Sequence, residues 1–157
     1  MTPDNVFVEQ KIISVVREIL TGCINEMLRD TRHHVPTVEF GDYFDGSAVV
    51  PTVTLSSCER TEKERIIRLD AYSLTITFSM PETPESELNC YTYSGAVSRA
   101  IYDNPTLSGT ADRAIITGKK YLSPKKPNCG DGWQLVISLR ITVENLLPCR
   151  LKQWSIK

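Results

Sequence analysis

Apolar residues at helical spacing open the chain. Over residues 3–28 they recur every three or four positions, which predicts an amphipathic helix with one buried stripe. Asp4 and Asn5 are candidate caps for its first turn, and Gly22 predicts a bend or an early end in its last turns. The predicted stripe is wide and consists of Ile12, Val16, Ile19, Cys23 and Met27, with Ile13, Leu20 and Ile24 beside them.

Alternation of apolar and polar residues then predicts four strands in two pairs. The first pair is a hairpin whose turn is the charged segment ERTEKER, residues 59–65, and whose return strand covers about residues 66–80. The alternation changes phase before Ala71, where Ile67 and Leu69 are apolar. A β-bulge, or a strand end that projects past the sheet, would account for the change. A projecting hairpin with its own apolar face needs a covering surface, which a neighbouring subunit could supply.

The second half of the chain has the same layout as the first half. A helix is expected over residues 85–103, followed by strands over residues 111–122 and 133–143. The expected buried stripe of this helix consists of Cys90, Tyr93, Val97, Ala100 and Ile101. The order helix, strand, strand, helix, strand, strand predicts a single α+β domain. In this domain an antiparallel or mixed sheet of about four strands carries both helices on one face. Residues 145–157 show no period and are interpreted as an extended C-terminal arm.

The segment NPTLSGTADR, residues 104–113, joins the second helix to the next strand. A phosphate-binding loop needs converging backbone N–H groups ahead of a helix, whereas here the helix comes first and the segment has a single glycine. We therefore interpret it as a corner. Pro105 ends the helix, Leu107 folds onto the core, and Gly109 takes a positive φ.

Composition excludes several classes of protein. The 157 residues are 41% hydrophobic and 24% charged, which is typical of a globular chain. The formal net charge of -1 argues against a general nucleic-acid binder. No apolar run is long enough to span a bilayer and the first residues do not form a secretory signal, so we expect folding in a reducing cytoplasm. The five cysteines are then expected to be free thiols.

Candidate catalytic and metal-binding groups are few. His33 and His34 are adjacent and have no further ligand at zinc spacing. The segment DYFDGS, residues 42–47, lacks the alternate oxygens and the final glutamate of a calcium loop. The sequence contains no GxSxG motif and no marked cysteine nucleophile. We therefore expect no enzyme activity, no cofactor and no metal.

Charged and aromatic loops remain, and we interpret them as contacts with other subunits or partners. They are the long segment of residues 29–50, with a short strand at residues 37–40, the hairpin around residues 56–71 and the connection over residues 119–132. The candidate interface residues are Tyr43, Phe44, Asp45, Arg60, Glu62, Lys63, Glu64, Arg65, Ile67, Leu69, Lys119, Lys120, Lys125 and Lys126.

Residues 86–144 resemble the tail terminator proteins of tailed bacteriophages and prophages, also called tail-completion or minor tail proteins. In that family a helix closes with an Asn-Pro-x-Leu-Gly-Gly-like corner, and the chain then enters a strand pair whose last member alternates strongly. Ser108 stands where a second glycine is common. The matching residues are Asn104, Pro105, Leu107, Gly109, Ala111 and Trp133.

The resemblance implies a structural virion subunit that forms a ring, typically a hexamer, at the head-proximal end of the tail tube. Its partners would be copies of itself, the tail tube protein and the head–tail connector, with no membrane and with DNA contact only in the ring lumen. Two alternatives stay open. One is another neck, head-completion or minor tail subunit. The other is a small cytoplasmic ligand-binding or regulatory module, with Tyr43 and Phe44 lining a pocket.

Overall fold

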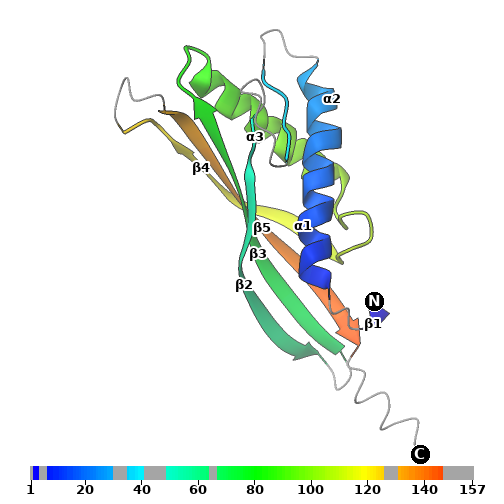
Figure 1. Ribbon diagram of the computed structural model, residues 1–157. Helices are drawn as coiled ribbons and strands as arrows, with labels where there is room; N and C mark the ends of the chain where they lie inside the picture. Colours follow the sequence, from blue (N-terminus) through cyan, green and yellow to red (C-terminus); the bar gives the residue numbers. More distant parts are fainter. Residues whose placement is uncertain are drawn as a thin grey trace, which may run out of the picture.

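A long, twisted sheet with helices on one of its faces makes up the fold (Figure 1). The computed structural model describes residues 2–3, 7–29, 35–40, 49–63, 67–125 and 131–146. The α+β class predicted from the sequence is confirmed, with the expected order of helix, two strands, helix and two strands.

Four long antiparallel strands form the sheet. They are β2 (Thr52–Lys63), β3 (Ile67–Pro81), β4 (Arg113–Leu122) and β5 (Asp131–Leu146). β3 pairs with β2 on one side and with β5 on the other, and β4 pairs with the opposite side of β5. Within the described chain, β2 and β4 are therefore the two long outer strands.

Two predicted element ends are wrong for one reason. A fifth strand, β1 (Thr2–Pro3), pairs in parallel with Asn145 and Leu146 at the end of β5. The first helix therefore does not start at Pro3, and the predicted arm does not start at Asn145. Residues 4–6 and 147–157 lie outside the described ranges. A pairing between residues this far apart leaves no local pattern in the sequence.

The first helix contains a π-helical turn that changes which residues are buried. α1 (Val8–Ile19) continues through the π-helical turn Leu20–Ile24 into α2 (Asn25–Leu28), so the disturbance expected near Gly22 does not end the helix. A π-helical turn holds more residues than an α-helical turn, which moves the buried stripe by one position. Beyond it Ile24 and Leu28 are buried, and the predicted Cys23 and Met27 are only half-buried.

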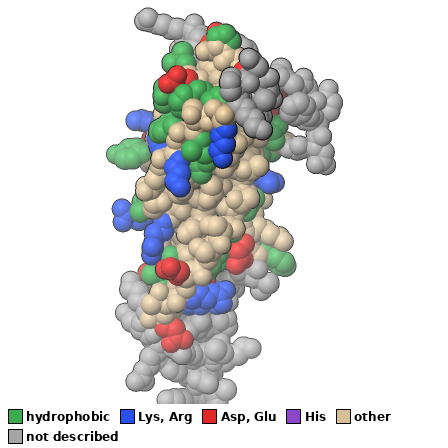
Figure 2. All heavy atoms as spheres, turned by 90° about the vertical axis from the view of Figure 1, so that its left-hand side faces the viewer, with side chains coloured by type: hydrophobic (Ala, Val, Ile, Leu, Met, Phe, Trp, Pro, Cys, Tyr) green, Lys and Arg blue, Asp and Glu red, His purple; other side chains and the backbone are tan. Residues whose placement is uncertain are grey.

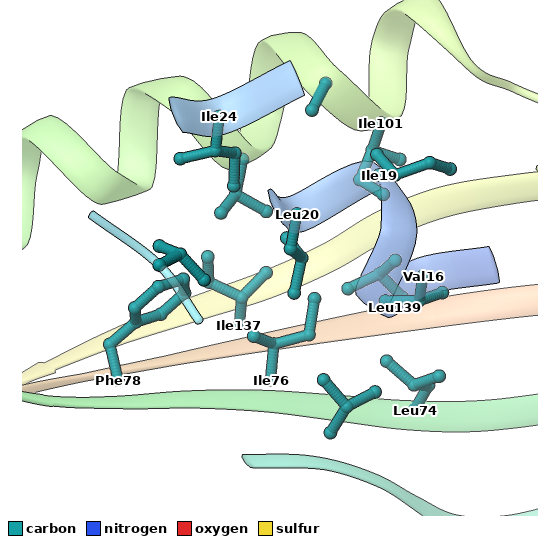
Figure 3. Close-up of a cluster of buried hydrophobic side chains, with 14 of the residues drawn as sticks. Val16, Ile19, Leu20, Ile24, Leu74, Ile76, Phe78, Ile101, Ile137 and Leu139 are labelled. Carbon is teal, nitrogen blue, oxygen red and sulfur yellow. The ribbon is translucent and has the colours of Figure 1, made fainter. Parts of the chain in front are cut away.

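The core lies between the helices and one face of the sheet (Figure 3). The alternating residues 72–80 of β3 are buried there as predicted, and so are the odd-numbered residues 135–143 of β5. Phe78 of β3 stacks on Tyr93 with ring centroids 4.9 Å apart. The predicted stripe of α3 (Ser86–Asp103) is entirely buried and comprises Cys90, Tyr93, Val97, Ala100 and Ile101.

The hairpin is longer than the sequence suggested. β2 continues to Lys63, so residues 59–63 are strand where a turn was predicted. A β-bulge lies in β2, between Leu55 and Ser57, but it does not alter the alternation of β3. β3 runs against β5 without a register shift from Ile67 to Ser79. Ile67 therefore faces away from the helices, on the opposite side of the sheet from the core.

The predicted strand at residues 37–40 is only an isolated bridge between Val38 and Val49. Asn25 of α2 and Tyr93 of α3 hold this bridge in place. The Asn25 amide donates to the carbonyl oxygen of Val38 at 2.9 Å and accepts from its N–H at 2.7 Å. The Tyr93 hydroxyl donates to the carbonyl oxygen of Pro36 at 2.5 Å. These contacts fix residues 35–40 over the end of the first helix.

Candidate assembly surfaces

The corner after α3 is a closed structural unit. Asn104, with φ -129° and ψ 61°, has left the helical region ahead of Pro105, as predicted. Leu107, Ser108 and Gly109 follow with φ of 49°, 58° and 84°. The corner N–H groups are used internally, since those of Leu107 and Gly109 donate to the carbonyl oxygens of Asn104 and Thr106. The segment therefore has no converging N–H groups for a phosphate.

Leu107 anchors this corner to the core. Its side chain is fully buried, although it lies in a turn between two elements. The N–H of Ala114, in β4, donates to the carbonyl oxygen of Pro105 at 2.7 Å and ties the corner to the next strand. The corner thereby sets the angle at which the chain leaves α3 and enters the sheet.

The sheet extends beyond the start of α1. Glu9, in the first turn of α1, accepts a hydrogen bond from the Tyr72 hydroxyl at 3.3 Å. Residues 67–71 of β3 continue past this point beside β2 and β5, over roughly 17 Å at 3.3 Å per residue. The projecting strand end expected from the sequence is thus a three-stranded extension of the sheet, visible at the lower end of Figure 1.

A buried carboxylate organises this extension. Asp70 is 0% exposed and lies on the helix side of β3. The Arg68 Nε donates to its Oδ2 at 3.1 Å, and Arg60 Nε lies 3.3 Å from its Oδ1 as an ion pair without hydrogen-bond alignment. Burial, with the charges of Glu9 and Asp70, raises the pKa of Tyr72. The pairing compensates the cost of burying the carboxylate and holds the strand ends together.

The face of the sheet opposite the helices is open and rich in hydroxyl groups. Residues paired across antiparallel strands share a face, so the register places these side chains together. Figure 2, which views the molecule from the left of Figure 1, shows mainly backbone and uncharged polar surface with scattered Lys and Arg. The hydroxyl residues are Thr52, Thr54, Ser73, Thr75, Thr77, Ser79, Ser138 and Thr142, and the basic ones are Arg113, Lys120 and Arg140.

The structure separates several of the predicted interface residues. Lys119 and Lys120 point to opposite faces of β4, and the Lys119 ammonium donates to the Ser94 carbonyl and the Ser98 hydroxyl of α3. Ile67 is buried and Leu69 is half-buried, whereas Lys125 is exposed. In β2, Arg60 and Glu62 are exposed and Lys63 is the last residue. Tyr43, Phe44, Asp45, Glu64, Arg65 and Lys126 lie outside the described residues.

An exposed cluster that the sequence did not indicate lies at the other end of the sheet. We call Leu88, Tyr91, Tyr121 and Trp133 the aromatic patch. The Tyr91 ring lies 5.5 Å from that of Tyr121 and 6.5 Å from that of Trp133, centroid to centroid. Leu88 is 49% exposed, Tyr91 47% and Tyr121 41%. The only sequence signal was that Leu88 and Tyr91 fall outside the buried stripe of α3.

A shallow pocket of about 350 Å³ lies between α1 and the start of β2. The Arg17 guanidinium stands 5.5 Å from the centre of the Phe40 ring at its wall. Residues 50–54 complete its lining. A pocket of this size with one cation could hold a small anionic ligand.

Among the described residues, no group of His, Cys, Asp and Glu side chains could hold a metal ion. The predicted candidates His33, His34 and residues 42–47 fall outside those ranges. Cys23, Cys58 and Cys90 are free thiols. No helix in the described part of the chain is long and apolar enough to cross a membrane.

No protein-family model matches the chain, and no curated protein sequence matches it.

Proposed function

We propose that the protein is a structural subunit of a bacteriophage or prophage tail. It assembles as a ring, with a hexamer as the expected size, caps the tail tube and contributes to joining the head to the tail. The observation that carries the proposal is the corner at residues 104–113. The residues that resemble the tail terminator pattern there build a rigid connection anchored by Leu107, so the pattern has a structural role and not a catalytic one.

The shape of the sheet supports a role in assembly. Helices cover one face, while the opposite face is polar and open, and the three-stranded extension reaches past α1. Exposed charges on β2, such as Arg60 and Glu62, can fix the register between neighbouring subunits more than their affinity. In a ring, the corner and the core would give each subunit a fixed shape, and the three-stranded extension would supply contacts with neighbouring subunits. DNA contact would be restricted to the lumen.

Capping can be tested with purified components. The cognate tail tube protein is polymerised in vitro with and without this protein, and tube ends are imaged by negative-stain electron microscopy. We expect a ring at one end of each tube and an arrest of elongation. Light scattering coupled to size-exclusion chromatography should give one oligomer. A monomer at every concentration that leaves tube growth unchanged would refute the proposal. Binding to the portal complex and not to tubes would favour a neck or head-completion subunit.

A ligand-binding or regulatory module is the second candidate, and the pocket beside Arg17 favours it. This function predicts that a small anion binds in the pocket and raises the melting temperature of the wild-type protein. Arg17→Ala would remove that increase, because the cation at the pocket wall is lost. A monomeric protein with this behaviour would support the module over the ring, and an anion screen without any shift would count against it.

A further inference from the structure

We propose that residues 147–157 of one copy dock on the aromatic patch of a second copy, and that this contact links the subunits. The inference goes beyond the proposed function, because self-association through this contact holds whether or not the ring caps a tail tube. It rests on the exposure of the patch, on the composition of the segment and on the distance between them.

The patch has the chemistry of a protein interface. Tyrosine and tryptophan side chains are enriched at the centres of interfaces, where they bury a large area at low entropic cost. Tyr91 and Tyr121 are held in defined positions by hydrogen bonds, from Tyr91 to the Glu87 carboxylate at 2.8 Å and between Tyr121 and the Ser94 hydroxyl at 2.7 Å. Because the rings are already oriented, a partner orders few side chains when it binds them.

The sequence LPCRLKQWSIK, residues 147–157, matches this surface. It combines four large apolar residues with three cations and no acidic residue. The exposed carboxylates of Glu85 and Glu87 stand at the start of α3, next to Leu88 in sequence. The nearest described cation on the helix side of β4, Lys119, is engaged by Ser98. The cationic segment therefore meets an apolar surface with an acidic border.

Trp154 of the segment cannot reach the patch of its own copy. β5 places Trp133 at one end of the sheet and Leu146 at the other, 13 residues on, or roughly 43 Å at 3.3 Å per residue. Tyr121, opposite Leu135, is about 36 Å from Leu146 on the same measure. Trp154 lies eight residues past Leu146, so full extension carries it at most about 29 Å.

An apolar surface nearer to the segment exists but is largely covered. Ile67 and Ala71, on the open face near the end of β5, are each 8% exposed. They leave little area for Trp154 to bury, whereas Leu88, Tyr91 and Tyr121 of the aromatic patch are each 41–49% exposed. Docking on a second copy is therefore favoured. The contact joins two different surfaces, so its repetition gives a closed ring or an open filament.

The test uses two full-length variants that fail on opposite sides of the contact. Tyr91→Glu disables the patch and leaves the segment intact, and Trp154→Glu disables the segment and leaves the patch intact. We expect each variant to be folded by circular dichroism and to self-associate at least about tenfold more weakly than wild type in analytical ultracentrifugation. Mixed together, they should form a one-to-one dimer, because one intact patch meets one intact segment. Tyr102→Glu, at a 78% exposed tyrosine farther along α3, is the matched control and should assemble as wild type.

Several results would overturn the inference. The first is that both variants assemble as the wild-type protein does. The second is that the mixture stays monomeric although both components are folded, and the third is that the wild-type protein never associates. Loss of stability in Trp154→Glu with unchanged assembly would show docking within one copy. If both variants lose assembly and the mixture pairs, but wild-type rings leave tail tubes unaffected, the inference stands and the proposed capping function fails.

Discussion

Replacing Leu107 by alanine tests whether the corner is anchored as described. The leucine side chain is 0% exposed, and its backbone φ of 49° would be shared by alanine, so the change acts through lost packing. Leucine-to-alanine changes at buried sites cost about 2.7–5 kcal/mol, from the transfer of the removed atoms and from the cavity left behind. We therefore expect a loss of about 3 kcal/mol, or a melting temperature roughly 6–12 °C lower.

Urea unfolding followed by circular dichroism measures this loss. The protein concentration has to be fixed, because the self-association proposed above would add to apparent stability. Leu122→Ala is the matched control, since this leucine is 44% exposed at the end of β4 and lies outside the aromatic patch, and its change should stay below about 1 kcal/mol. If the two variants unfold alike, Leu107 does not anchor the corner. The interpretation of residues 104–113 as a rigid connection would then be refuted.

Four further changes follow from the structure. Ser108→Gly should raise the free energy of unfolding by up to about 1 kcal/mol in urea titration, because glycine tolerates the φ of 58°; a loss would contradict this strain. Asn25→Ala should lower the free energy of unfolding by roughly 1–3 kcal/mol, since both hydrogen bonds to Val38 disappear. A loss below about 0.5 kcal/mol, which is typical of surface substitutions, would show that these hydrogen bonds do not stabilise the fold. Burial raises the pKa of Cys90 to about 11, so the folded state keeps a proton that the unfolded chain releases. The thiol should not affect the free energy of unfolding below about pH 9, and it should lower this free energy by up to about 2–3 kcal/mol as the pH rises towards 11. In Cys90→Ala the free energy of unfolding should fall less steeply over this pH range; the same slope as in wild type would contradict the assignment. Gly132→Ala should lower the melting temperature measured by calorimetry, because a Cβ there would lie 2.5 and 2.7 Å from two carbonyl oxygens of β3, and wild-type stability would mean that the strand end adapts.

Elements that bury one face were predictable from sequence. One face of β5 and one face of α3 are buried, and this produces the alternation of apolar residues in β5 and the apolar stripe in α3. Both patterns predicted the buried residues correctly. β2 was less predictable, because exposed charges on an outer strand resemble a turn. Its residues 59–63 are held as strand by their pairing with β3, which lies elsewhere in the sequence. The π-helical turn at Leu20–Ile24 likewise leaves no composition signal beyond Gly22.

The surfaces were harder to predict than the fold. Lys119 and Lys120 were both predicted to lie at an interface, but adjacent strand residues point to opposite faces, and Lys119 bonds to α3. The aromatic patch is formed by α3, β4 and β5, so its members lie up to 45 positions apart, from Leu88 to Trp133. A pattern within one element cannot show such a cluster. The corner was predictable because all its determinants, from Asn104 to Gly109, are contiguous.

The place of β5 in the sheet has a consequence for biosynthesis. β1, β3 and β4 all pair with this one strand, although it follows each of them along the chain. While a ribosome is still making the first 130 residues, only the β2–β3 hairpin and the helices can form, and the core face of the sheet lacks its middle. The nascent chain therefore exposes apolar residues until β5 emerges. A premature stop before this strand would leave β4 without any partner in the described sheet, and folding is expected to be completed only after β5 has left the ribosome.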